Sequence, residues 1–355
     1  MGRLLRYAAA VTVSTAVAGA GLLAAQVRQA RRDIPRAEAP PPRASGLYGG
    51  PRGRPPLVLA MLGDSSAAGY GVHKPRQTPG ALLATGISRR LGRPVQLHCL
   101  AVVGATSSRL APQVEAALEL SPDLAVIVVG GNDITHRANR AAAVRHLARA
   151  VRQLREAGAQ VVVGTCPDLG TIRPIRPPLR WIAGHWSRRL AAAQTVAAVE
   201  AGAWTVSLGD LLGPRFAAEP ARMFSFDRFH PSADGYAAAA AVMLPTALAA
   251  LGAVDPAVLP AQKVRSLPRA AAEASRHAGT EVSATSVAGD RRGPGGRWAL
   301  LRRPTGSMLV RRVLEMVRQR GPDDSEIMAP TGRTDTAGPT EADGGASAQE
   351  QLEPR

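Results

Sequence analysis

Five short apolar runs, separated by longer stretches of helical character, constrain the fold of this chain more than any other feature. The runs are 57–62, 95–103, 124–129, 160–165 and 203–208. The helical stretches lie near 79–91, 107–120 and 138–157, in a segment that ends near 201, and at 233–251. Strands that alternate with helices of this length are typical of a parallel sheet covered on both faces. We therefore expect an α/β fold over residues 57–252, with three α/β/α layers around a doubly wound, five-stranded parallel sheet.

Polar and small residues follow the ends of four of these predicted strands. They are Ser65 after the first, Gly104 after the second, Gly130, Gly131, Asn132 and Asp133 after the third, and Asp227 with His230 after the fifth. The carboxyl ends of strands in an open α/β sheet form one crevice, where such folds bind ligands. Taken alone, Ser65 is explained at least as well by a helix N-cap, because Asp and Ser are common there. The coincidence of four such positions favours a catalytic crevice.

These residue types fit acyl transfer to a serine nucleophile. Serine is a weak nucleophile that needs a base, and histidine exchanges a proton near neutral pH. A carboxylate holds the imidazole in one tautomer, and Asp227 lies three residues before His230. We therefore predict a catalytic triad of Ser65, His230 and Asp227. The Ser65 and Gly104 backbone N–H groups and the Asn132 amide are the predicted oxyanion-hole donors.

The four blocks resemble those of the SGNH, or GDSL-like, serine hydrolase family. They read Gly63-Asp64-Ser65, then Gly104, then Gly130-Gly131-Asn132-Asp133, and finally Asp227-Arg228-Phe229-His230-Pro231. The resemblance covers about 57–252 and implies a flavodoxin-like strand order, 2-1-3-4-5. It also implies hydrolysis of carboxylic esters through an acyl-serine, without a metal or other cofactor. Ser66 departs from the name motif, which has leucine there, and this weakens an assignment to the secreted lipases that keep the full motif.

The two cysteines should not form a disulfide in that strand order. Cys99 lies on the second predicted strand and Cys166 follows the fourth, so two strands separate them. At roughly 4.8 Å per strand, this separation exceeds what a disulfide can bridge. We expect both thiols to be free.

An uncharged segment of 21 residues, 7–27, precedes the domain and is long enough to span a bilayer. Residues 1–28 therefore fit a transmembrane anchor, or a signal segment cleaved after Ala18-Gly19-Ala20. Four arginines between 28 and 36 leave the orientation open by the positive-inside rule. With this segment, the chain resembles actinobacterial members of the family. We expect a membrane-anchored protein with its hydrolase domain outside the cytoplasm; cleaved secretion and a cytoplasmic orientation are the alternatives.

The remaining regions carry no apolar period. Residues 29–56 are rich in Pro and Arg, and we predict a linker there. Residues 253–355 are predicted to be a largely disordered tail. Within it, 298–317 mixes apolar residues with arginines and could form a basic amphipathic helix on a membrane, or remain solvated.

The formal net charge of +17 raises the question of nucleic-acid binding. The charge is scattered rather than striped and no nucleic-acid motif accompanies it, so we expect no nucleic-acid partner. We expect a monomer that acts on a lipid ester, a small acyl ester or an O-acetyl group on a saccharide. Two alternatives are an acyltransferase that uses the same triad on an envelope alcohol, and a non-catalytic envelope-binding module.

Overall fold

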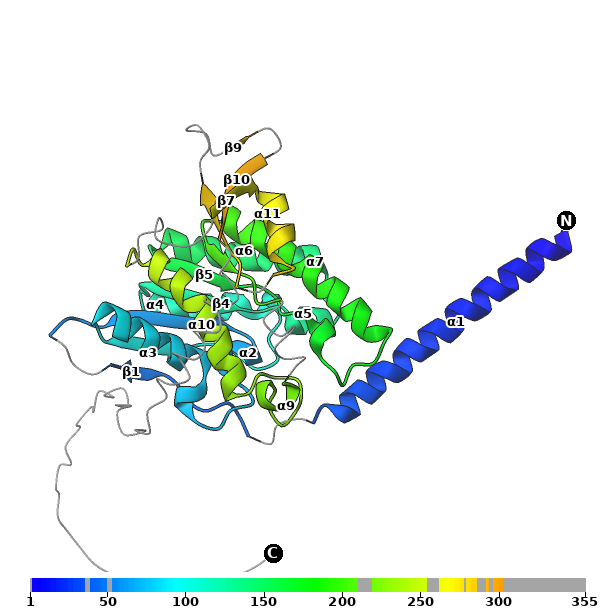
Figure 1. Ribbon diagram of the computed structural model, residues 1–355, viewed down its shortest axis with the longest axis horizontal. Helices are drawn as coiled ribbons and strands as arrows, with labels where there is room; N and C mark the ends of the chain where they lie inside the picture. The colour runs from blue at the N-terminus through cyan, green and yellow to red at the C-terminus, as the bar shows by residue number, and fades with distance from the viewer. Residues whose placement is uncertain are drawn as a thin grey trace, which may run out of the picture.

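A ten-stranded mixed sheet forms the centre of the molecule (Figure 1). The structure is a computed structural model, which describes residues 2–35, 39–49, 53–209, 219–253, 262–277, 279–285, 292–293 and 296–302. The strands are β1 Gly46–Tyr48, β2 Leu57–Gly63, β3 Val95–Cys99, β4 Leu124–Val128, β5 Gln160–Gly164, β6 Trp204–Val206, β7 Gln262–Ser266, β8 Glu281–Thr285, β9 Arg292–Gly293 and β10 Gly296–Arg302. Their spatial order is β1-β3-β2-β4-β5-β6-β8-β10-β7, with β9 paired to β10.

The five predicted strands are β2, β3, β4, β5 and β6, and they are parallel neighbours in the order β3-β2-β4-β5-β6. The expectation of a purely parallel, five-stranded sheet is wrong, however. Strand β1 adds to one edge antiparallel to β3, and β8, β10 and β7 extend the other edge in antiparallel pairs. These additions cover edges that would otherwise expose unpaired backbone groups.

The three central parallel strands, β2, β4 and β5, contribute side chains to two hydrophobic cores, one on each face of the sheet. On β4, Leu124, Val126 and Val128 face one core. The residues between them, Ala125 and Ile127, face the other. This period of two follows from the pleat of the strand, and burial on both faces explains why the run reads as continuously apolar.

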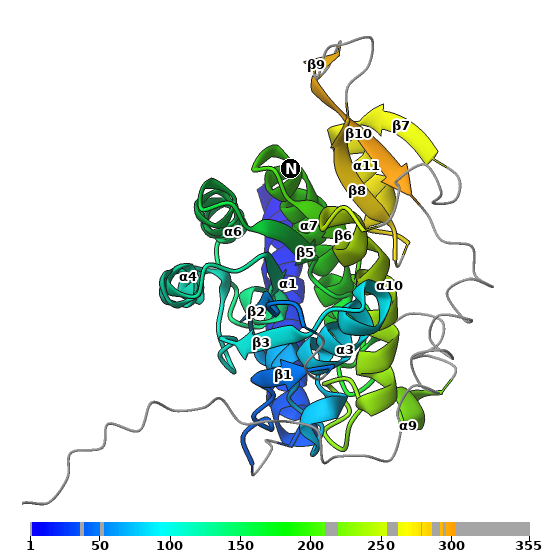
Figure 2. The same ribbon diagram turned by 90° about the vertical axis from the view of Figure 1, so that its left-hand side faces the viewer.

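Helices cover both faces, as Figure 2 shows, with α4 and α6 on one side of the strands and α3 and α10 on the other. Their bounds are α1 Gly2–Asp33, α2 Ser65–Ala68, α3 Pro79–Leu91, α4 Leu110–Glu119, α5 Gly131–Thr135, α6 Arg140–Glu156, α7 Leu179–Glu200, α9 Pro220–Met223, α10 Ala233–Ala250 and α11 Leu267–Ala274. Local capping sets such boundaries. Helix α3, for example, begins after Thr78, whose side chain accepts from the Ala81 N–H, and ends at Gly92 in a left-handed conformation.

The predicted disordered tail is wrong over residues 262–302, which form β7, α11, β8, β9 and β10 in the described segments. A third core joins these elements to α7 and includes Val199, Leu267, Val282 and Leu301. The apolar stretch of β10 is short and is flanked by arginines, so the sequence did not indicate a strand there. Because 298–302 belong to β10, the predicted amphipathic helix cannot start at Trp298; its remainder, 303–317, lies outside the described residues.

The predicted linker, 29–56, is also partly ordered. Its first residues complete α1, and β1 pairs with β3. Tyr48 is buried and donates from its hydroxyl group to the Ala44 carbonyl oxygen. The backbone of β1 pairs with the edge of β3. The Pro-rich composition of this segment gave no indication of that pairing. Elsewhere, the expectation of free thiols at Cys99 and Cys166 is confirmed.

Candidate active site

Ser65, the predicted nucleophile, lies at the sharp turn between β2 and α2. Gly63 has φ +133°, and a Cβ atom there would overlap the Val128 carbonyl oxygen, so the turn requires glycine. Asp64 caps α2 by accepting from the Ser66 N–H at 2.9 Å. Ser65 is therefore the first helical residue, and it is 7% exposed.

Ser65, His230 and Asp227 form a continuous hydrogen-bonded chain. Ser65 Oγ lies 2.8 Å from His230 Nε2, although 165 residues separate the two in sequence. His230 Nδ1 lies 2.5 Å from Asp227 Oδ2. Donation from Nδ1 to the carboxylate leaves Nε2 free to accept the serine proton. The structure thus brings together all three residues of the predicted triad.

Asp227 is held as a carboxylate by its own loop. Its Oδ1 accepts from the Phe229 and His230 backbone N–H groups, both at 2.9 Å. Burial opposes ionisation, but the His230 hydrogen bond and charge, together with these two N–H groups, outweigh it and lower the pKa of Asp227 below its ordinary value. The anion therefore persists at neutral pH opposite the histidine.

The predicted oxyanion-hole residues lie on three segments: Ser65 on α2, Asn132 on α5 and Gly104 in the loop after β3. Asn132 lines the same cavity as Ser65, and its Nδ2 donates one hydrogen bond to the Ala105 carbonyl oxygen at 3.1 Å. An amide carries two N–H groups, so one remains for a ligand. Gly104 adopts φ +80° in the turn beside Ala105. None of the described contacts joins Gly104 to Ser65, and it is not among the residues that line the cavity.

We expect Asn132→Ala to lower kcat by about 10²–10³-fold with little change in KM. The remaining amide N–H would meet charge that develops only in the transition state. Steady-state kinetics on a soluble ester test this. A raised KM with unchanged kcat would instead identify Asn132 as a substrate-binding residue.

Two buried glutamines position the site and escaped prediction. Gln113, on α4, accepts from the Gly63 N–H at 2.7 Å and donates to the Gly63 carbonyl at 3.0 Å. Gln194, on α7, accepts from Cys166 N and donates to the Val129 carbonyl. One sequence feature could have indicated these residues: a single amide side chain on an otherwise apolar helix face, as with Gln113 between Leu110 and Ala117.

Asp133 also has a role that the sequence did not indicate. Its carboxylate accepts from the Ser107 N–H at 3.1 Å and from the Ser107 hydroxyl at 2.8 Å. It therefore ties the loop after β3 to α5, the short helix that carries Asn132. This contact fixes the spacing between the segment that holds Gly104 and the helix that holds Asn132, the two predicted oxyanion-hole residues outside α2.

Aromatic residues brace the histidine. The Tyr70 ring lies 4.6 Å from the His230 ring between centroids, and the buried Tyr236 hydroxyl donates to the Tyr70 carbonyl at 2.7 Å. Gly71 has φ +97° and its carbonyl accepts from Ser225 Oγ. These contacts link the nucleophile loop to the loop that carries the base.

Asp64 is a buried acid next to the triad. Burial raises its pKa from the ordinary 3.8 to about 6, against the lowering effects of the Ser66 N–H and the His230 charge. Between these two values the folded protein binds more protons than the unfolded chain. Ionisation of Asp64 therefore lowers the free energy of unfolding as pH rises from about 4 to about 6.

Asp64→Asn should remove that pH dependence. Relative to the wild type, its free energy of unfolding should rise by up to about 3 kcal/mol between pH 4 and pH 7. Hydrogen bonds that the substitution changes shift the free energy of unfolding by the same amount at every pH, so they do not alter this slope. Urea unfolding at four pH values tests the slope, and parallel wild-type and variant curves would contradict it.

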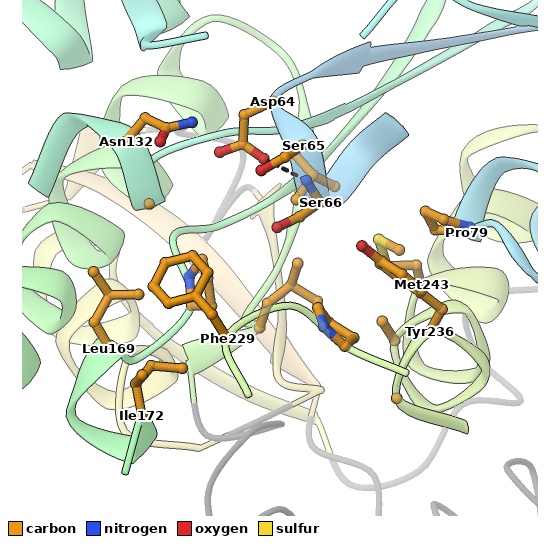
Figure 3. A pocket seen from close by; sticks show the side chains of 17 residues that line it. Asp64, Ser65, Ser66, Pro79, Asn132, Leu169, Ile172, Phe229, Tyr236 and Met243 are labelled. Carbon is orange, nitrogen blue, oxygen red and sulfur yellow. Dashed lines mark hydrogen bonds between the residues drawn. The ribbon is translucent and has the colours of Figure 1, made fainter. Parts of the chain in front are cut away.

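An apolar cavity of about 780 Å³, including its open mouth, adjoins the triad. Figure 3 shows Asp64, Ser65 and Ser66 at one end, with Leu169, Ile172 and Phe229 across the cavity. The other apolar lining residues are Pro79, Val128, Pro167, Leu208, Pro231, Ala239 and Met243. Such a cavity suits an aliphatic group whose reactive end points at Ser65.

The family model and the curated relative that match this sequence agree with this geometry. The GDSL-like lipase/acylhydrolase family matches residues 61–238. The GDSL-like esterase Rv1075c of Mycobacterium tuberculosis is 46% identical over 244 residues, covering 65% of this chain and 78% of that protein. A solved structure of TesA aligns with a TM-score of 0.42 at 24% identity, covering 56% of this chain and all of that one. An SGNH hydrolase from Slackia heliotrinireducens gives a TM-score of 0.41 at 23% identity over 54% of this chain and 99% of that one.

Proposed function

The chain belongs to the GDSL-like lipase/acylhydrolase family and is an ester-hydrolysing enzyme, and we propose that it acts through an acyl-enzyme formed on Ser65. The observation that carries the proposal is the hydrogen-bonded chain from Ser65 through His230 to Asp227. Among the described residues, none outside this series of three hydrogen-bonded side chains is needed as nucleophile or base.

In the first half-reaction, Ser65 Oγ attacks the ester carbonyl carbon and passes its proton to His230 Nε2. Asp227 stabilises the resulting imidazolium. The tetrahedral oxyanion accepts hydrogen bonds from Asn132 and the Ser65 N–H. Collapse breaks the C–O bond to the alcohol, which leaves with the proton from His230. Water then attacks the acyl-serine with the same base, releasing the acid and restoring Ser65.

The apolar cavity supports an aliphatic acyl group as the part of the substrate that binds beside Ser65. The 167–172 segment and α10 together contribute seven of its seventeen lining residues. A lipid ester or a small aliphatic ester fits this lining better than an O-acetyl saccharide, because an acetyl group leaves most of the apolar wall unused.

Covalent labelling tests the mechanism. A fluorophosphonate should give one adduct, on Ser65, in the full-length protein, and His230→Ala should label far more slowly. A series of esters with increasing acyl length should show rates that rise and then fall once the chain exceeds the cavity. An adduct on another residue, or turnover that survives labelling, would refute the proposal. Ester products formed with an added alcohol would indicate acyl transfer.

We also propose that α1 anchors the enzyme to a membrane, with the catalytic domain outside the cytoplasm. Figure 1 shows α1 projecting away from the domain, and Val17 is 67% exposed. The helix contacts the domain near its C-terminal end, where the Gln26 side chain donates to the Pro177 carbonyl and accepts from the Leu179 N–H. Among the described helices, α10 alone meets a length and hydropathy criterion for spanning, but 72% of that window is buried in the core.

We expect the full-length protein to stay in the membrane pellet after washes with high salt and with alkaline carbonate. Salt removes attachment by arginines alone, because it screens their charge. A chain that begins at residue 25 keeps Gln26 and should be released. A soluble product whose N-terminal residue is Gly21 would show a cleaved signal instead, and resistance to protease on intact cells would place the domain in the cytoplasm.

A further inference from the structure

Helix α1 meets the catalytic domain at the first turn of α7. The side chains of residues 14–22 are exposed, and burial begins at Leu23. The Gln26 side chain then donates to the Pro177 carbonyl at 2.6 Å and accepts from the Leu179 N–H at 3.1 Å. The start of α7 is therefore fixed to α1 at the end of the predicted membrane span, 7–27.

A second contact shows which part of the domain lies nearer the span. The Asp33 carbonyl accepts from the Arg228 guanidinium at 2.9 Å. Asp33 follows Gln26 by seven residues, which is about 10 Å further along the helix axis. Of these two contacts, the one at α7 is closer to the proposed bilayer. In Figure 1, α7 lies on the side of the domain from which α1 projects.

Helix α7 exposes two tryptophans. Trp181 is 67% exposed and Trp186 is 46% exposed, although tryptophan is highly buried on average in folded proteins. Successive helical residues lie about 100° apart around the axis, so these two mark the edges of a sector about 140° wide. The residues between them in this sector are Ile182, His185 and Arg189. We call these five residues the α7 face.

The opposite side of α7 supports a wall of the acyl cavity. Gly184 and Ser187 are buried there. The Leu169 N–H donates to Ser187 Oγ at 3.3 Å, and a Cβ atom at Gly184 would lie 3.0 Å from Gly170 Cα. Leu169 lines the cavity, whereas neither exposed tryptophan does. About one helix diameter, roughly 10 Å, therefore separates the α7 face from this wall.

The charge around the α7 face is positive. Arg189 is exposed, and no acid precedes Glu200, the last residue of α7. Tryptophan favours the headgroup region of a bilayer, where its ring is apolar and its N–H meets water. Arginines near the surface are attracted to anionic lipids. Three arginines directly after the predicted span on α1 are exposed as well: Arg28, Arg31 and Arg32.

We propose that the α7 face lies in the headgroup layer of the bilayer that α1 enters. Continuity with the α1 contact, the two exposed tryptophans and the positive charge all fit this partner. The contact holds the Leu169 wall of the acyl cavity close to the membrane surface. This inference rests on the proposed anchoring of the enzyme and names a second membrane contact for it.

Tryptophan fluorescence tests the proposal, because bromine on lipid acyl chains quenches the tryptophans that contact the membrane. The protein has four tryptophans, and α1 contains none of them. Full-length protein is reconstituted in vesicles of phosphatidylcholine and phosphatidylglycerol, with and without brominated chains. We expect quenching in the wild type and its loss in Trp181→Phe combined with Trp186→Phe.

The matched control is Trp204→Phe combined with Trp298→Phe, at positions on β6 and β10. Its fractional quenching should exceed that of the wild type, because the α7 tryptophans are then the ones that emit. Equal quenching in the two double variants would overturn the proposal. So would a wild type that pellets with the vesicles and is not quenched, a result that would leave the α7 face to a protein partner.

Hydrolysis of a soluble ester separates this inference from the proposed function. Both double variants should keep the wild-type rate, because none of the four tryptophans lines the acyl cavity. Hydrolysis without bromine quenching would refute the membrane contact alone, and quenching of the α7 tryptophans without hydrolysis would refute the proposed activity alone. Protein that is quenched through the α7 tryptophans but leaves the pellet in alkaline carbonate would refute the spanning anchor and support the surface contact.

Discussion

Replacing Ser65 with alanine should lower kcat by about 10⁴-fold or more. Ser65 is the hydroxyl-bearing residue that contacts His230 Nε2, at 2.8 Å. Its neighbour Ser66 also lines the cavity, but among the described contacts only Ser65 pairs with the base. The alanine variant therefore lacks an activated nucleophile, while the Gly63 turn and the Asp64 cap remain.

The variant should fold normally, because it loses one hydroxyl group and one hydrogen bond, worth about 1 kcal/mol. Steady-state kinetics together with thermal unfolding test both statements. Ser66→Ala is the matched control and should keep most of the wild-type activity. If Ser65→Ala retained a tenth of that activity, Ser65 would not be the nucleophile.

Asp227→Asn should cost about 10⁴-fold in kcat, an effect set by the direction of one hydrogen bond. Oδ1 of Asp227 accepts from two backbone N–H groups. The oxygen of an asparagine would keep these bonds, so its NH₂ group would face His230 Nδ1. Nδ1 would then have to accept, which places the imidazole proton on Nε2 and leaves no acceptor for the Ser65 proton.

The control for this variant is Asp234→Asn. The Asp234 carboxylate lies near the same loop but outside the triad, where it pairs with Arg222. This control should retain near wild-type kcat. Nitrogen NMR of the imidazole reports the tautomer directly, and Asp227→Asn should move the proton from Nδ1 to Nε2. Full activity in the asparagine variant would show that Asp227 is not needed to orient His230.

Much of the catalytic site could be predicted because its parts are locally encoded. Each predicted site residue follows a strand in the chain, and a parallel sheet brings those strand ends to one edge. Asp227 and His230 lie on one turn, so their contact needs no distant element. The same locality explains why the boundaries of α3, α6 and α10 agree closely with the predicted helices, since capping residues and apolar period act within a few positions.

The less successful predictions concern contacts made across the fold. The position of Gly104, which is not among the residues that line the cavity, depends on the loop after β3, whose Val102 N–H donates to the Gly63 carbonyl. The roles of Gln113 and Asp133 depend on partners 50 and 26 residues away. A single polar residue in a sequence does not indicate which distant backbone group it will satisfy.

The sequence by itself predicted the α/β architecture, the order of the five parallel strands through its family blocks, and the three residues that form the hydrogen-bonded chain of Ser65, His230 and Asp227. The spacing of apolar residues and the residue types at strand ends are properties of short segments, so they can be recognised in the sequence alone. Only the tertiary structure decided that 262–302 extends the sheet, and that Asp33, Arg173 and Arg228 meet in one pocket. An edge strand is stabilised by the strand it pairs with, and a pocket by the elements that surround it. Neither exists until segments far apart in the chain have packed together.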